Sequence, residues 1–261
     1  MLYREDSEGL IVIGQPAHAW VSGQMARAWG NEHFGAVVPY EEVCLGAEQH
    51  DIAHADWERA PILNPRTGRP YSFLEAPKTM HIPIVSCASS LVLNQGRYAA
   101  FLVSLHFTGL YEGYDTTQGS PEDSRAIQAF LAREYAFQER LLTSLRNDPY
   151  YAPYTTPGIV ARNQGLIRSW DAMSLALCFS LKTSKSFSEV PTADGTTTLT
   201  LTPVKSDPTQ VAVDPWPFSQ DAVILHCEGR RLPQTFTDED AMRVALACAP
   251  WVTITMHLRP A

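Results

Sequence analysis

The chain has 261 residues, of which 45% are hydrophobic and 18% are charged, and its formal net charge is −8. A chain of this length can bury a full core without disulfides or a structural metal, as one large domain or a main domain with an appendage. The acidic balance argues against a nucleic-acid or anionic-membrane surface, which needs clustered Lys and Arg. We therefore expect no nucleic acid and no membrane among its partners.

The five cysteines are dispersed and form no CxxC pair. This spacing predicts buried thiols in a reducing cytoplasm rather than a disulfide framework or a zinc ribbon. The first ten residues show no basic segment followed by an apolar one, so we expect no signal peptide. No apolar run approaches the roughly 18 residues that a membrane span requires. These features predict a soluble, cytoplasmic protein.

In chain order, residues 10–15 (LIVIGQ) are either a short strand or an apolar lead-in. Apolar residues then recur with helical spacing, and several segments begin with a proline or a capping residue. The longest segment begins with Ser120 as N-cap and Pro121 at the first helical position. The patterns predict helices over residues 16–30, 41–58, 81–93, 96–113, 120–148 and 165–181.

The pattern changes at about residue 185, where polar and apolar residues begin to alternate as in strands. Residues 196–204 and 251–260 are predicted strands, and residues 222–232 are a predicted hairpin with Gly229 near its turn. A short helix capped by Thr237 is expected before the last strand. We therefore predict a mainly α fold with two parts, a helical metal-binding domain over residues 1–185 and a strand-rich subdomain over residues 186–261.

Each of five predicted helices carries at least one residue that can bind a metal. A lone buried histidine is usually a satisfied core residue, but burying several such groups without a partner costs several kcal/mol for each carboxylate. A dication would offset that cost for all of them, and packed helices can bring such side chains to one point. The candidate ligands are His18, His50, Asp51, His81, His106 and Asp171.

The order His, His-Asp, Asp on separate helices resembles the HD-domain superfamily of metal-dependent phosphohydrolases. The segments QPAHAWVSGQMARAWG, EEVCLGAEQHDIAH and LIRSWDAMSLAL carry this resemblance. NPRTGRPYSF, FLVSLHFTGLYE and DPWPF point more narrowly to an uncharacterised bacterial family of HD-like proteins. The resemblance implies an HD-type helical bundle with a small strand-rich C-terminal extension.

The resemblance also implies a site with two divalent ions (Mn, Mg, Zn or Fe). His18, His50, Asp51 and Asp171 would hold one ion, His81 and His106 would add the second, and Asp51 would bridge the two. His54 lies four residues after His50, on nearly the same face of the predicted helix, so we expect it to support the ligands or face the substrate. Asp51 and His54 are thus the candidate catalytic residues.

The expected substrate is a small anion, because dications polarise phosphoryl groups and arginine binds two phosphate oxygens. The candidate substrate-binding residues are Arg66, Arg69, Lys78 and Arg97. Phosphoester hydrolysis is the first expectation. A mixed-valent di-iron oxygenase that cleaves a C–C or C–P bond is the alternative, because the same ligands suit iron. A catalytically inactive binding module is the third, and a homodimer is also possible.

Overall fold

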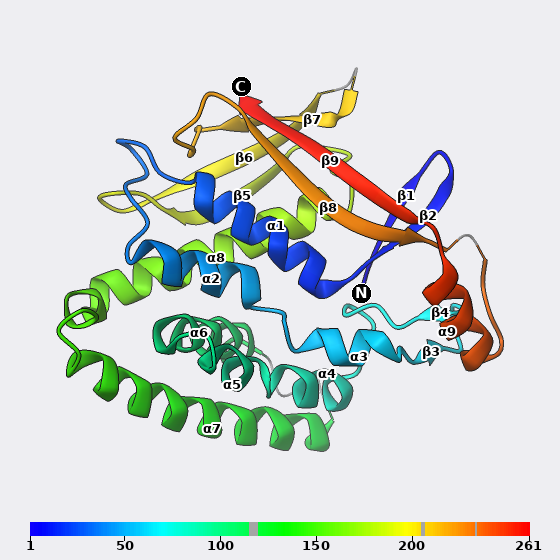
Figure 1. The fold of residues 1–261 in the computed structure, drawn as a ribbon, viewed down its shortest axis with the longest axis horizontal. Helices are drawn as coiled ribbons and strands as arrows, with labels where there is room; N and C mark the ends of the chain where they lie inside the picture. The colour runs from blue at the N-terminus through cyan, green and yellow to red at the C-terminus, as the bar shows by residue number, and fades with distance from the viewer. Residues whose placement is uncertain (115–119, 205–206, 233) are drawn as a thin grey trace.

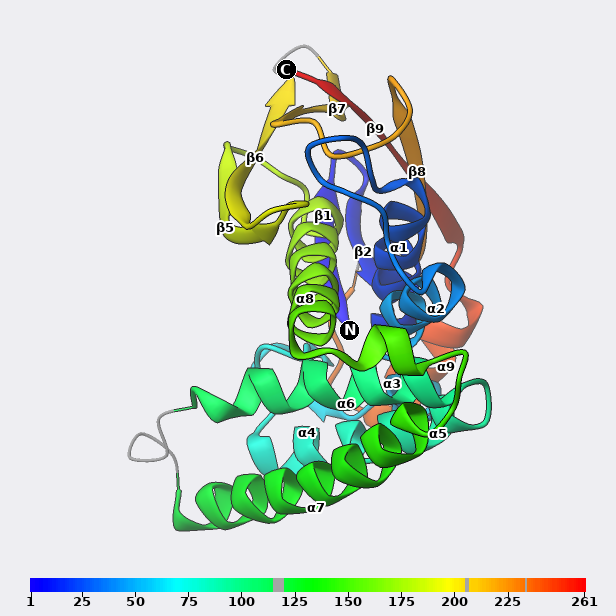
Figure 2. The same cartoon turned by 90° about the vertical axis from the view of Figure 1, so that its left-hand side faces the viewer.

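The computed structural model describes residues 1–114, 120–204, 207–232 and 234–261. In these ranges a curled seven-stranded sheet lies above two tiers of helices (Figures 1 and 2). The fold is therefore mixed α/β, and the prediction of a mainly α, HD-type helical bundle with a small strand-rich extension is wrong. The reason is that strands at both ends of the chain join one large sheet, which an inspection of each segment alone does not reveal.

The strand order in the sheet is β1-β2-β8-β9-β7-β6-β5. Each neighbouring pair is antiparallel except β7 and β9, which are parallel. The strands are β1 (Leu2–Asp6), β2 (Gly9–Ile13), β5 (Lys185–Pro191), β6 (Thr196–Val204), β7 (Asp207–Asp214), β8 (Val223–Arg231) and β9 (Trp251–Pro260). A separate two-stranded sheet joins β3 (Leu63–Asn64) and β4 (Arg69–Pro70).

The N-terminal hairpin is what joins the two ends of the chain. The apolar run of β2 is a strand rather than a lead-in, and Ile11 and Val12 pair with Arg231 and Arg230 of β8. Gly229 makes this pairing possible, because a Cβ atom there would lie 2.5 Å from Ile11 Cγ2. The predicted hairpin over residues 222–232 is therefore wrong. Gly229 lies inside one continuous strand, at a close approach of two backbones.

The helices form two tiers below the sheet (Figures 1 and 2). α1 (Gln15–Ala28) packs on β8, and α8 (Pro157–Cys178) packs on β5. The other helices are α2 (Tyr40–Gln49), α3 (His54–Arg59), α4 (Lys78–Val85), α5 (Ala88–Leu93), α6 (Arg97–Glu112), α7 (Pro121–Arg146), the short 3₁₀ helix η1 (Ala152–Thr155) and α9 (Glu239–Cys248). The predicted start of α7 is confirmed, since Ser120 and Asp123 form a capping box.

Two predicted helices are in fact broken. The segment 41–58 stops being α-helical at Gln49, and consecutive tight turns follow in which His54 N bonds Asp51 O at 3.0 Å. The segment 81–93 divides into α4 and α5, and Pro83 lies in the last turns of α4, where its ring removes a backbone donor. The first break matters for function, because it changes the directions of the side chains around His50.

The C-terminal segment contributes to the same core as the helices. Phe218 is 2% exposed and meets the Trp29 ring edge-to-face at 5.5 Å, and Trp29 in turn meets Trp170 of α8. Apolar residues of the sheet and of the helices form one continuous cluster. In the described ranges, no helix is both long enough and apolar enough to cross a membrane.

Candidate metal centre

The structure brings five of the six predicted ligands into one buried cluster. His18 comes from α1, His50 and Asp51 from the end of α2 and the turn after it, His106 from α6 and Asp171 from α8. They form two overlapping groups that share His50, one with His18 and Asp51 and one with His106 and Asp171. The side chains meet although their positions span more than 150 residues of sequence.

Close helix packing places these side chains. At Gly23, where α1 crosses α2, an added Cβ atom would lie 2.7 Å from Glu48 Cβ. At Gly46, where α2 meets α6 and α8, it would lie 3.3 Å from Ile167 Cδ1. These two glycines let the backbones approach, and the end of α2 therefore lies between α1, α6 and α8.

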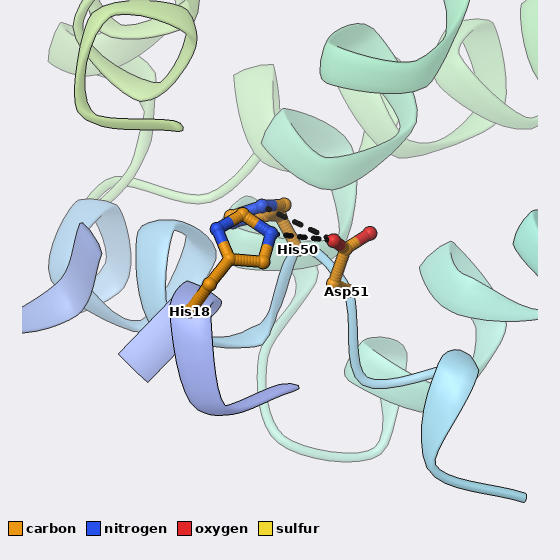
Figure 3. Close-up of side chains that lie close together, drawn as sticks. All are labelled: His18, His50 and Asp51. Atoms are coloured by element: carbon orange, nitrogen blue, oxygen red, sulfur yellow. Dashed lines mark hydrogen bonds and ion pairs between the residues drawn. The ribbon is translucent and has the colours of Figure 1, made fainter. Parts of the chain in front are cut away.

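Neighbouring donor atoms of the cluster lie at distances close to those of ligands that share an ion, within two overlapping groups. Figure 3 shows His18 and Asp51 in contact, with His18 Nε2 2.8 Å from Asp51 Oδ2. His50 Nε2 is 3.7 Å from the same oxygen and 3.5 Å from Asp171 Oδ1. His18 Nε2 is 3.9 Å from Asp171 Oδ1. Donors that share one divalent ion at bonds of about 2.1 Å lie roughly 3–3.5 Å apart, so only small movements separate this arrangement from a coordination shell.

Hydrogen bonds at the other ring nitrogens orient both imidazoles. His18 Nδ1 is 2.8 Å from Ser174 Oγ, whose own proton goes to Asp171 O, so the His18 ring donates to Ser174. His50 Nδ1 donates to Ala47 O at 2.8 Å. Each ring therefore turns its Nε2 atom toward the cluster. Outer-shell bonds of this kind fix the tautomer of metal-ligating histidines.

His106 completes the cluster on the α6 side. Its Nε2 atom is 3.8 Å from Asp171 Oδ2, and its ring is 4.9 Å from the His50 ring. Asp171 thus turns one oxygen toward His50 and the other toward His106. Three imidazoles and two carboxylates are a donor set for Zn, Fe, Mn or related ions. The cluster can therefore hold a metal ion.

His54 and His81 lie beside this cluster as a pair. Because the chain turns tightly after His50, His54 Nδ1 lies 3.3 Å from Asp51 Oδ1, and neither nitrogen of this buried ring has a hydrogen-bond partner. The His81 ring is 5.4 Å from the His54 ring, and His81 Nδ1 contacts Tyr111 Oη at 2.5 Å. The two oxygens of Asp51 therefore face different sides, Oδ2 toward His18 and His50 and Oδ1 toward His54.

The charges of the cluster set its protonation states, and a metal would have to displace the proton that His50 holds at neutral pH. Burial opposes the charged form of His50, but Asp51 and Asp171 outweigh it and raise its pKa to about 9. Burial and the nearby His50 lower the pKa of His106 to about 4. Burial and His54 likewise lower the pKa of His81 to about 4. The surrounding histidines hold the pKa of Asp51 well below its usual value despite its burial. At neutral pH the carboxylates are thus ionised, and His81 and His106 keep their lone pairs.

The four predicted substrate-binding residues are dispersed. Arg66 and Arg69 lie on the β3–β4 hairpin, which Tyr3 and the chain near Phe236 hold beside β1. Arg97, at the start of α6, pairs with Asp148 and donates to Ser144 Oγ.

Of the four predicted cations, Lys78 is the one whose charge helps to lower the pKa of His81, beside the cluster. Its ammonium group lies 5.8 Å from the ring centre of Tyr111.

Three further residues of the site, Ser22, Ser174 and Tyr111, were not predicted from the sequence. A signal existed for Ser174, three residues after Asp171 on α8, and for Ser22, four residues after His18 on α1, since such spacings share one side of a helix.

The fold and the cluster define a mixed α/β protein with a buried histidine–aspartate site that can hold a metal ion. The family model described as protein of unknown function (DUF3891) matches residues 1–234, so the chain belongs to the DUF3891 family. The resemblance to the HD-domain superfamily, and to a family of HD-like proteins, is corrected by this match and by the seven-stranded sheet. No curated protein and no solved structure matches the chain.

Proposed function

We propose that this protein is a metal-dependent hydrolase that acts on a small phosphoester. The observation that carries the proposal is the convergence of His18 Nε2, His50 Nε2 and oxygens of Asp51 and Asp171, with neighbouring atoms 2.8–3.9 Å apart. His50 Nε2 is buried without a hydrogen bond and faces both carboxylates. A cation among these atoms would satisfy the imidazole and both carboxylates together, which explains why the fold tolerates their burial.

The proposal includes two ions. His18, His50, Asp51 and Asp171 would hold the first, and Asp51, His54 and His81 would hold the second. Asp51 Oδ1 lies 3.3 Å from His54 Nδ1. The support is that His54 Nε2 is buried without a hydrogen bond to any described residue, while Nδ1 faces Asp51 Oδ1. His106, whose Nε2 atom is 3.8 Å from Asp171 Oδ2, is a further possible ligand beside His50 and Asp171.

Divalent ions held there would polarise a phosphoryl oxygen and promote ionisation of a water molecule near neutral pH. The protein's own contribution is to hold the ligands. Ser174 and Ala47 orient the His18 and His50 rings through their Nδ1 atoms, so that the Nε2 atom of each ring faces the carboxylates. His106 and Asp171 lie on α6 and α8, two helices that pack against each other, so their separation is set by the core rather than by a loop. Lys78, beside His81, remains the candidate among the predicted cations for neutralising the substrate.

The test begins with metal content, measured by mass spectrometry on protein purified with and without air. Parent protein is compared with Asp51→Asn and His50→Ala, and with His257→Ala, which changes an exposed histidine of β9. We expect bound Mn, Mg or Zn in the parent and in His257→Ala and its loss in the two site variants. His54→Ala separates the ions, because it should lower the metal content from two per chain to one.

Loaded protein is then assayed on chromogenic phosphomonoesters and phosphodiesters. Hydrolysis that falls with metal content in Asp51→Asn and persists in His257→Ala would support the proposal. Two tightly bound iron atoms with no phosphoesterase activity would replace it with the oxygenase alternative. No metal under any loading condition, with all variants as stable as the parent, would leave a binding module.

A further inference from the structure

A cavity of about 310 Å³ opens beside the candidate metal centre, between α6 and α8. Its wall includes His106, the metal-site residue of α6, together with Glu112, Gln164 and Arg168. Pockets for small ligands begin at about this size. The cavity therefore offers a small molecule a route to the buried cluster.

The spacing of residues on α8 connects this cavity to the cluster. Gln164, Arg168 and Asp171 are four and three residues apart, so they follow one face of the helix, with neighbouring Cβ atoms roughly 5–6 Å apart. Asp171 is the end of this row that lies in the cluster. Gln164 is the other end, and its amide donates to Leu105 O of α6 at 2.9 Å. Arg168 thus lies on the cavity wall, between Gln164 and Asp171 along α8.

Arg168 carries its charge on the cavity wall without a partner among the described residues. It makes no hydrogen bond and no ion pair with the residues that the structure describes, and its side chain is exposed. By contrast, Arg162, one turn and a half earlier on α8, donates to Phe34 O and Thr192 O. A guanidinium with free donors on the wall of a polar cavity is suited to a planar pair of oxyanion oxygens.

Small residues keep the space beside Arg168 open. Gly109 of α6 lines the cavity, and a Cβ atom there would lie 3.2 Å from Gln164 Nε2. Glu112, farther along α6, places a carboxylate on the outer wall, where it accepts a hydrogen bond from Tyr135 at 2.8 Å. The cavity is thus positive at Arg168 and negative at its outer wall.

We propose that this cavity is the substrate-binding pocket, that Arg168 binds the phosphate-like oxyanion of the substrate next to His106, and that Glu112 favours a neutral or hydrogen-bond-donating group at the outer end. This proposal rests on the proposed hydrolase function, whose substrate class it specifies. It replaces none of the metal ligands. It identifies Arg168, which was not among the cations predicted from the sequence, as a specificity-determining residue.

The test measures binding of orthophosphate by titration calorimetry, on manganese-loaded and on metal-free protein. Arg168→Gln should weaken orthophosphate binding at least about tenfold in loaded protein, with unchanged metal content, since one charged hydrogen-bonding partner is lost. Glu112→Gln should strengthen it, because a repulsive charge is removed while an acceptor for Tyr135 remains. The matched control is Arg146→Gln, which removes the same charge from the exposed end of α7.

Opposite effects of Arg168→Gln and Glu112→Gln cannot come from unfolding, which would weaken binding in both. The inference is overturned if Arg168→Gln binds orthophosphate within twofold of the parent, or if the parent binds none at millimolar concentration. If the hydrolase proposal fails, the measurement of metal content shows it, because no metal is bound. In that case the comparison of the parent with Arg168→Gln on metal-free protein still decides whether the cavity binds an oxyanion.

Discussion

Removing the hydroxyl of Ser174 tests whether His18 is a metal ligand. The His18 ring donates from Nδ1 to Ser174 Oγ at 2.8 Å, and Ser22 donates to the same oxygen at 3.0 Å. Ser174→Ala deletes this acceptor without touching any proposed ligand atom. In the variant the ring is free to carry its proton on Nε2 instead, where it would bond Asp51 and block metal binding.

The expected size of the effect follows from these contacts. Loss of an outer partner of a ligating histidine lowers metal affinity roughly 10–100-fold, which corresponds to about 1.4–2.8 kcal/mol. The metal-free protein should also lose about 1–3 kcal/mol of unfolding free energy, because Ser174 Oγ is the buried hydrogen-bond partner of both His18 and Ser22. Both effects concern one atom, but they are measured independently.

Metal affinity is measured by competition with a chromophoric chelator, and stability by urea unfolding of metal-free protein. Ser169→Ala is the matched control, since Ser169 is also buried on α8 but donates to Gly165 O at 2.8 Å, within its own helix. It should leave metal affinity unchanged. If Ser174→Ala binds metal as tightly as Ser169→Ala does, His18 is not a ligand held by Ser174, and the assignment of the first ion fails.

Two further predictions concern parts of the chain outside the centre. Asp238→Ala should lower the free energy of unfolding in urea by about 1 kcal/mol, because Asp238 Oδ1 caps α9 by accepting a hydrogen bond from Ala241 N at 2.7 Å. Thr237→Ala should change this free energy little. Equal losses in the two variants would contradict the assignment of the cap. A thiol reagent at about pH 8 should label Cys87 and Cys248 rapidly, because both are exposed. Cys44 should stay unlabelled until the protein unfolds, because burial raises its pKa to about 12. Labelling of folded protein followed by mass spectrometry checks this, and rapid reaction of Cys44 would show that its helix opens.

The Asp238 result would also explain a small error of the sequence reading. Thr237 and Asp238 are both good capping residues, and either choice fits the apolar pattern of α9. The backbone decides, since Asp238 is extended and its side chain reaches the first-turn amide. The start of α7 was predicted correctly, because Ser120, Pro121 and Asp123 combine three local signals.

The candidate site was largely predictable for a related reason. Burying His18, His50, Asp51, His106 and Asp171 separately would be expensive, so their presence in apolar segments already indicated a common partner. The expected face of His54 was derived from a continuous helix over residues 41–58, and that helix is broken after Gln49. The actual direction of His54, toward Asp51 Oδ1, depends on the tight turns between the two helices.

The sequence by itself determined the local elements with strong signals and the set of polar residues that required burial, because helical spacing, caps and desolvation costs act within a few residues. Only the tertiary structure decided that the N-terminal hairpin pairs with β8, that Gly229 lies in a strand, and that Arg168 faces a cavity beside His106. Strand pairing and cavity formation depend on contacts between segments far apart in the chain. Their energies come from the whole packed core, so no local pattern encodes them.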